Sequence, residues 1–343
     1  MSYSLNSGDI LISITAELGK IGWVPDNLGE AFINQHTALV RLKGKFTDSK
    51  FVAYLLSSKE MNHKINRLND SGAKAGLNLS TIRAIPLLLP PLPEQRKIAE
   101  ILSTWDKSIV TTEKLIAASQ QQKKALMQQL LTGKKRFAGF SEKWEEVKLK
   151  QLGEVVSGGT PSTTNSDYWD GDVFWVTPTD ITKLKSHYIC SSIRKISKSG
   201  LLSCSAKLVP KGSLLVCTRA TIGTLAITKT EMCTNQGFKN LVPNKSTDVE
   251  FLYYLLAHER HQLISKASGS TFLELSKKDF DNIRLKVPSF KEQQKIAAVL
   301  TAADQEIDAL QSKLAHLQQE KKALMQQLLT GKRRVVLEAE TSH

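Results

Sequence analysis

The run KKALMQQLLTGK occupies residues 123–134 and recurs without a change at residues 321–332, 198 positions later. A repeat with this period is about the size of a domain and is too long for one unit of a solenoid or propeller. In both copies apolar residues lie at helical spacing, and a glycine followed by basic residues marks a helix end. The sequence therefore predicts two related units, each ending in the same helix.

Each copy closes a long heptad pattern, in which apolar residues follow one another at steps of three and four over more than four heptads. The pattern predicts coiled-coil helices at residues 93–133 and 290–331, each beginning close to a proline. A helix over residues 94–132 would be about 58 Å long. We expect the seam between the helices, and the interface with other subunits, to be formed by Ile98, Leu102, Trp105, Ile109, Ile116, Lys123, Leu126, Leu130, Ile296, Leu300, Ile307, Leu310, Leu314, Leu317, Lys321, Leu324 and Leu328.

Two lysines interrupt this apolar seam. If the helices pack antiparallel about a two-fold-like axis, the numbers of facing residues add up to about 426. Lys123 then lies next to Asp304, and Lys321 next to Asp106. We predict two symmetric ion pairs that fix register and orientation more than they add stability. In the alternative, both lysines extend along the seam to solvent.

The segments between the helices have a different character. Residues 144–287 contain short β-like runs at 214–218, 225–228 and 283–287 and a helix candidate at 249–261. The first half of the chain contains related segments in the same order: Gly8 corresponds to Gly212, and Tyr54 corresponds to Tyr254. The fold class is therefore mixed α/β, with two globular domains joined by two long antiparallel coiled-coil helices as a pseudo-two-fold repeat.

Charge and cysteine usage bound the possible partners. The 343-residue chain carries a net charge of +14, and both halves have more Lys and Arg than Asp and Glu. Such a chain suits a polyanion, although a merely basic globular protein is the alternative. The four cysteines show no CxxC pair, which disfavours zinc and fits reduced thiols. Without a long apolar run or a signal peptide, we expect a cytoplasmic protein and no membrane partner.

Several motifs occur in a fixed order along the chain: SGGTPS at residues 157–162, YWDG at 168–171 and FWV at 174–176. The helices begin with PPLPEQ at residues 90–95 and FKEQQKIA at 290–297, and both end in LLTGK. From about Gly8 to Arg334 the chain resembles the specificity subunit of type I restriction-modification systems. The opening third of the first recognition domain, with its Gly-Gly-Thr-Pro segment, has no counterpart in this sequence.

This resemblance implies a subunit without catalytic activity or cofactor. Each globular domain would read one half of a bipartite target in double-stranded DNA. The two helices would pack antiparallel as a spacer and dock two methyltransferase (modification) subunits, to which restriction/translocase subunits add.

The implied domains follow from the motifs. They are a truncated first target-recognition domain (1–92), the first helix (93–133), a linker (134–143), the second target-recognition domain (144–289), the second helix (290–331) and a basic-then-acidic tail (332–343). Because the first domain lacks the counterpart of residues 144–204, we expect lopsided recognition of the two half-sites. The alternative is a truncated coiled-coil adaptor that does not read DNA and only binds modification subunits; salt-dependent binding to duplex DNA separates the two.

The lack of recognisable catalytic motifs in the sequence agrees with a non-enzymatic subunit. The sequence has no phosphate-binding loop of the Gly-x-x-x-x-Gly-Lys-Ser/Thr type and no Gly-x-Gly-x-x-Gly cofactor turn. Glu146 and Lys148 lack a nearby Pro-Asp partner, and His258 and His261 lack a third ligand at metal spacing. We therefore expect no catalytic residues and no metal site, and a free-standing nuclease or methyltransferase is disfavoured.

Polar and basic residues of the loops are the candidates for DNA contact. Hydroxyl and amide groups suit phosphates and base edges, lysines more often meet phosphates, and Arg219, in a turn bounded by glycine, is the best candidate for bidentate guanine contact. For each residue the alternative is a solvated surface group. The predicted DNA-binding residues are Thr160, Ser162, Thr163, Asn165, Lys183, Lys185, Arg194, Lys195, Arg219, Ser270, Thr271 and the first-half counterpart Lys74.

Overall fold

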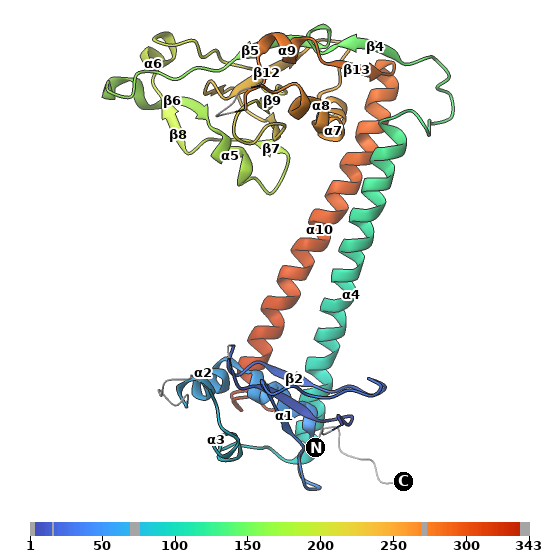
Figure 1. Cartoon of the computed structure of the whole chain (residues 1–343), viewed down its shortest axis with the longest axis vertical. Helices are drawn as coiled ribbons and strands as arrows, with labels where there is room; N and C mark the ends of the chain where they lie inside the picture. Colours follow the sequence, from blue (N-terminus) through green and yellow to red (C-terminus); the bar gives the residue numbers. More distant parts are fainter. Residues whose placement is uncertain (1–3, 16, 69–75, 269–272, 337–343) are drawn as a thin grey trace. The chain divides into compact units, whose positions relative to one another are not determined.

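The computed structural model describes residues 4–15, 17–68, 76–268 and 273–336 (Figure 1). The chain divides into two compact units: unit 1 comprises residues 1–116 and 309–343, and unit 2 comprises residues 117–308. Two helices of 39 residues, α4 (Leu92–Leu130) and α10 (Phe290–Leu328), each contribute residues to both units. Both predicted long helices are thus confirmed. In the described part of the chain, no helix is both long and apolar enough to cross a membrane.

The repeated Leu-Leu-Thr-Gly-Lys sequence ends both helices in the same way. Gly133 and Gly331 have φ of 70° and 71°, a left-handed conformation that glycine adopts without strain. Their amides donate to Leu130 O and Leu328 O at 3.4 and 3.3 Å, so the chain turns off the helix axis three residues earlier than the heptad pattern predicts.

Unit 1 packs three strands and three short helices against the first half of α4. The antiparallel sheet has the order β2 (Ile21–Trp23), β1 (Ile10–Ser13), β3 (Thr37–Val40). The helices are α1 (Ser49–Ser57), α2 (Lys59–Arg67) and α3 (Leu79–Arg83). Alternate residues of β1, Ile10 and Ile12, face the core. The core also contains side chains from α1, α4 and the end of α10, namely Phe51, Ile98, Leu102 and Leu328.

Unit 2 is built on a five-stranded sheet. Its order is β5 (Gly153–Ser157), β12 (Phe238–Pro243), β9 (Leu214–Cys217), β10 (Leu225–Thr228), β7 (Tyr188–Ile189), and only the β10–β7 pair is parallel. Every residue of β9 and β10 is buried, as expected of strands covered on both faces. The predicted strands at 214–218, 225–228 and 283–287 are confirmed within a residue.

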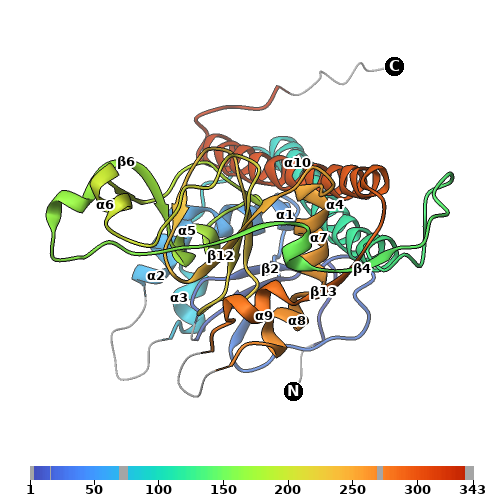
Figure 2. The same ribbon diagram turned by 90° about the horizontal axis from the view of Figure 1, so that it is seen from above.

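A second sheet extends unit 2, with the order β11 (Cys233–Thr234), β6 (Trp169–Val176), β8 (Arg194–Ile196). The short helices α5 (Pro178–Thr182) and α6 (Lys198–Leu202) flank it, and 3₁₀ turns cover Leu149–Gln151 and Ser166–Tyr168. Figure 2 shows β6 and α6 on the opposite side of this unit from α7 and α8. A separate antiparallel pair joins β4 (Glu145–Lys148) and β13 (Arg284–Val287).

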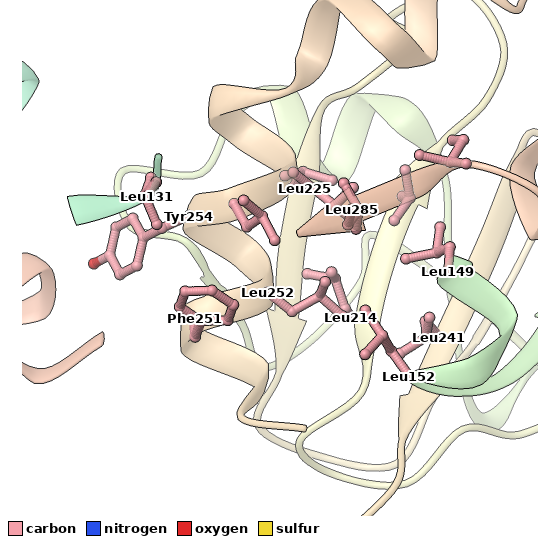
Figure 3. Packing of buried hydrophobic residues seen from close by; sticks show 14 of the residues in the cluster. Leu131, Leu149, Leu152, Leu214, Leu225, Leu241, Phe251, Leu252, Tyr254 and Leu285 are labelled. Atoms are coloured by element: carbon pink, nitrogen blue, oxygen red, sulfur yellow. The ribbon is translucent and has the colours of Figure 1, made fainter. Parts of the chain in front are cut away.

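The helix predicted at 249–261 is wrong in one respect, because it is two helices. It divides into α7 (Val249–His258) and α8 (Arg260–Ser265) at Glu259, whose ψ of 17° interrupts the helical geometry. A further short helix, α9 (Lys277–Asp281), precedes β13. Figure 3 shows Leu252 of α7 pointing toward Leu214 of β9, and Leu131, just after α4, lying beside Tyr254.

The two units share one framework. In unit 1, β1 lies between β2 and β3; in unit 2, β9 lies between β10 and β12 in the same antiparallel pairing. Gly8 and Gly212, which begin the corresponding segments, have φ of 82° and 84°. The internal repeat of the sequence is therefore a repeat of backbone structure.

Candidate nucleic-acid interface

Both predicted lysine–aspartate pairs are present. Lys123 of α4 donates to Asp304 of α10 in unit 2, and in unit 1 Lys321 donates to Asp106 at 2.5 Å. The start of α4 thus meets the end of α10, and the end of α4 meets the start of α10, which is antiparallel pairing. All seam residues named above are buried or half-buried. The alternative, in which both lysines extend to solvent, is excluded.

A tyrosine completes each pair. The Tyr54 hydroxyl donates to Asp106 at 2.5 Å, and the Tyr254 hydroxyl donates to Asp304 at 2.6 Å. The Lys321 and Lys123 ammonium groups lie 5.5 and 5.4 Å from the ring centroids of the same two tyrosines. Burial and the hydrogen bond to the aspartate raise the pKa of each phenol, so both tyrosines stay protonated donors.

A cleft lies beside each of these triads. The cleft in unit 1 has a volume of about 450 Å³ and is bordered by Tyr54, Asp106 and Lys321. Its counterpart in unit 2 has about 460 Å³ and is bordered by Tyr253, Asp304 and Lys123.

The connections at the helix starts also repeat. Gln95 accepts from Asp48 N at 2.9 Å, and Gln293 accepts from Asp248 N at 3.0 Å. These bonds fix the strand-to-helix corner of each unit.

A bidentate ion pair between an arginine and a glutamate is also repeated in the two units. Arg334 donates to both carboxylate oxygens of Glu94, at 2.7 and 2.6 Å, and Arg136 does so to Glu292, at 2.9 and 2.6 Å. The Arg334 hydrogen bond holds the pKa of Glu94 below its ordinary value.

The loop that begins the second recognition segment is closely tied to the sheets. Gly158 and Gly159 are buried, and their amides donate to Phe238 O and Thr234 O at 3.4 and 2.9 Å. A Cβ at Gly158 would lie 1.9 Å from Asn235 O, so only glycine fits. The backbone amides of these two glycines therefore join the loop to the sheet and are not available for a ligand.

Two tryptophans hold the rest of this loop, and neither was among the predicted site residues. Trp175 Nε1 donates to Gly159 O at 2.8 Å, and Trp169 Nε1 donates to Ser162 O at 3.0 Å. The two indoles meet edge to face with centroids 5.1 Å apart. Two carbonyls of the loop are thereby fixed, and the side chains of residues 162–164 remain exposed.

The four predicted loop residues differ in their surroundings. Thr160 donates to Gln236, and Asn165 caps the following turn by accepting from Asp167 N at 3.0 Å. Ser162 lies 2.8 Å from the Thr164 hydroxyl. Thr163 is exposed.

Four of the six predicted basic residues lie between the end of α5 and β8. The Arg194 guanidinium lies 3.7 Å from the Trp169 ring centroid, and Lys195 Nζ lies 4.9 Å from that of Phe174. Lys183 and Lys185, by contrast, are exposed between α5 and β7. The aromatic rings thus orient the two basic side chains of β8.

Arg219 forms an ion pair that the sequence did not predict. Its Nη2 lies 2.6 Å from Glu274 Oε2, and the two side chains are 44% and 35% exposed. The following residue, Ala220, has a φ of 56° in the tight turn between β9 and β10. The guanine contact of Arg219 remains a prediction. In this structure the guanidinium is paired with the Glu274 carboxylate.

A buried lysine lies close to this pair. Lys239 of β12 is only 8% exposed, and burial lowers its pKa although the nearby Glu274 carboxylate opposes that shift. In the sequence, this lysine stands in the strand segment FKNLV (residues 238–242). Periodicity alone would assign such a charged residue to the solvated face of the strand.

The equivalent positions in unit 1 have other chemistry. Aligning Asn34 with Asn235 places Ala38 at the position of Lys239, and aligning Gly8 with Gly212 places Thr15 at that of Arg219. Thr15 shares a hydrogen bond with His36 Nδ1 at 2.7 Å. The remaining predicted residues, Lys74, Ser270 and Thr271, lie outside the described residues.

Metal-binding geometry is not found in the described ranges, where no group of three His, Cys, Asp or Glu side chains could hold an ion. Cys190, Cys204, Cys217 and Cys233 are all free thiols.

Comparison with known proteins agrees with this architecture. The family described as "Type I restriction modification DNA specificity domain" matches residues 2–119 and 141–319. The chain is 40% identical over 167 residues to the type I restriction enzyme MjaIX specificity subunit of Methanocaldococcus jannaschii, an alignment that covers 48% of this chain but only 39% of that relative. A putative MjaX specificity subunit from the same organism is 25% identical over 97% of this chain and 80% of its own length.

Solved structures share the fold. The HsdS subunit from Thermoanaerobacter tengcongensis has a TM-score of 0.54 at 22% identity, covering 96% of this chain and 82% of that one. The S subunit of a type I restriction-modification system from M. genitalium has a TM-score of 0.61 at 18% identity, covering 96% and 84%. With the family match spanning most of its residues, this chain belongs to the type I restriction-modification DNA specificity family.

Proposed function

We propose that this chain is the DNA sequence-specificity subunit of a type I restriction-modification complex. It would read a bipartite target in double-stranded DNA and hold the modification and restriction subunits, without catalysing a reaction itself. Such a subunit works where the DNA is, in the cytoplasm.

One observation carries this proposal: the two units keep the same framework and differ in their surface loops. The triad of tyrosine, aspartate and lysine recurs in both units, while Arg219 in the turn after β9 is replaced by Thr15 in the turn after β1. A repeated scaffold with divergent loops suits two reading surfaces that recognise different base pairs.

The candidate DNA contacts are the surface groups of unit 2, in the domain that we assign to residues 144–289. Thr160, Ser162, Thr163 and Asn165 offer hydroxyl and amide groups on a loop fixed by two indoles. The exposed Lys183 and Lys185 suit phosphates, and the stacked Arg194 and Lys195 present charge in a fixed direction. Arg219 suits a base edge.

The long helices are the proposed docking surface for two modification subunits. Two antiparallel helices alone cover their seam incompletely, since Ile109, Ile116 and Leu317 are only half-buried. Outside the seam, Val110 and Leu115 of α4 are 47% and 49% exposed. Apolar side chains left open along a coiled coil suit further helices from a partner.

Selection from a random pool of DNA duplexes tests this function. The full chain with modification subunits is incubated with the pool, and bound duplexes are sequenced. Enrichment of two short fixed sequences separated by a fixed spacer supports the proposal. Stable binding of modification subunits with no enrichment at all would instead identify an adaptor that does not read DNA.

A further inference from the structure

Five charged side chains gather where the β9–β10 turn meets the segment before α9. Arg219 pairs with Glu274 at 2.6 Å, and Lys277 pairs with Asp281 at 2.7 Å. The buried Lys239 is close enough to feel all four charges, and of these Glu274 affects it most. The cluster combines three basic with two acidic side chains.

Backbone hydrogen bonds place the Glu274 carboxylate there. Glu274 and Ser268 exchange two backbone hydrogen bonds, at 3.0 and 3.1 Å, and Leu275 N donates to Thr218 O at 3.0 Å. Thr218 and Arg219 are consecutive, so the strand end that carries the arginine is bonded directly to the segment that carries the glutamate. The pair is therefore built into the fold and is not a chance meeting of two surface side chains.

Stability alone does not account for such a pair. Half-exposed ion pairs add little to folding stability, because solvent screens the charges and two long side chains lose freedom. The burial of Lys239 within an apolar strand is unfavourable in itself, and the Glu274 carboxylate offsets it.

The pair matters when DNA approaches. An unpaired arginine binds any phosphate, which gives affinity without sequence information. A carboxylate beside it repels phosphate oxygens, whereas the guanine N7 and O6 acceptors are uncharged and the cytosine N4 amino group donates to a carboxylate.

We propose that Glu274 is a specificity-determining residue, which withholds Arg219 from phosphates and lets it engage only where a G·C base pair meets both side chains. The inference rests on the proposed DNA-reading function. Unit 1 has Thr15 and Ala38 at the positions of Arg219 and Lys239, so the effect is confined to one half-site.

A double-mutant cycle tests this role. Wild type, Glu274→Gln, Arg219→Gln and the double variant are each titrated with a random-sequence duplex and with the duplex selected by the wild type, over a range of salt. We expect Glu274→Gln to bind the random duplex about tenfold more tightly, with a salt slope steeper by about one. Its preference for the selected duplex should fall by about the same factor.

On the Arg219→Gln background the same substitution should change random-duplex binding less than twofold, because no arginine is left to release. Glu274→Asp, which keeps the charge, should behave as wild type. As a matched control, Glu231→Gln removes an exposed carboxylate outside the cluster.

The outcomes separate the two claims. An equal gain with and without Arg219, or with Glu231→Gln, would show a general charge effect and overturn the inference. Unchanged discrimination in Glu274→Gln would overturn it as well. Only a wild-type chain that selects no sequence from the random pool would contradict the proposed DNA-reading function itself.

Discussion

Lys321 of α10 donates to Asp106 of α4 at 2.5 Å, and the same aspartate accepts from the Tyr54 hydroxyl at 2.5 Å. One carboxylate thus joins both helices to the small sheet domain of unit 1. In unit 2, Asp304 does the same for Lys123 and Tyr254. A polar contact repeated at one position of an apolar seam specifies register, because any shift of the helices leaves the charges without partners.

Removal of the shared acceptor should be costly. Asp106→Asn leaves Lys321 with no anionic partner in the half-buried seam, and we expect a loss of about 1–3 kcal/mol in the stability of unit 1. The exchange variant Asp106→Lys with Lys321→Asp keeps opposite charges across the seam. Thermal unfolding of both proteins measures the effect, and an exchange variant no better than Asp106→Asn would argue against pairing as the cause.

The two tyrosine contacts should be equivalent in energy. Tyr254→Phe removes a buried hydroxyl that donates to Asp304, and Tyr54→Phe removes its counterpart. Each should lower stability by about 1.5–3 kcal/mol, the net value of a hydrogen bond to a charged acceptor. Calorimetry of the two variants provides the comparison. If only one of the two variants lost stability, the two contacts would share their geometry but not their contribution to the free energy of unfolding.

The heptad pattern of the sequence accounts for most of this seam. Helical spacing gives the buried faces of α4 and α10, and the internal symmetry gives the pairing of Lys123 with Asp304. The helices are regular and long, so a small error per turn does not change which residues face each other.

The proposed DNA-reading surface was harder to predict, because its contacts join segments far apart in sequence. Arg219 and Glu274 meet only because β9 and the residues before α9 lie side by side. Likewise, Trp169 and Trp175 hold the loop at residues 158–165 through bonds that depend on the second sheet. Composition selected these polar groups as candidates for DNA contact, but it could not assign their partners within the protein.

The glycines of that loop give a test of its packing. Gly159→Ala would place a Cβ 2.4 Å from Ala206 N, whereas a Cβ at Gly22 would meet Leu11 Cβ at an ordinary 3.5 Å. We expect Gly159→Ala to destabilise unit 2 by about 1–3 kcal/mol. Gly22→Ala serves as the control and should change stability little. Equal unfolding temperatures for both variants would mean that the loop does not pack closely against residues 205–206.

Acid should weaken unit 1 through Glu94. The bond from Arg334 lowers the pKa of this carboxyl from its ordinary 4.5, so the folded chain binds the proton less readily than the unfolded chain. Its contribution is therefore fully present above about pH 4.5 and is lost as the pH falls through the lowered pKa.

Glu94→Gln should accordingly show a shallower decline of the unfolding temperature below about pH 5 than the wild type. Glu17→Gln, at an exposed glutamate in the same unit, should decline as the wild type does. Parallel curves for Glu94→Gln and wild type would mean that the Arg334 bond does not couple to folding.

The most direct test of the proposed specificity role is adenine methylation by a reconstituted complex. Modification subunits are combined with the wild-type chain, with Arg219→Gln, or with no chain, and methylated genomic DNA is sequenced. We predict methylation at one bipartite motif that requires the chain, and a loss of preference in only one half of that motif for Arg219→Gln. Methylation that occurs at the same sites without the chain, or none that depends on it, would contradict the account.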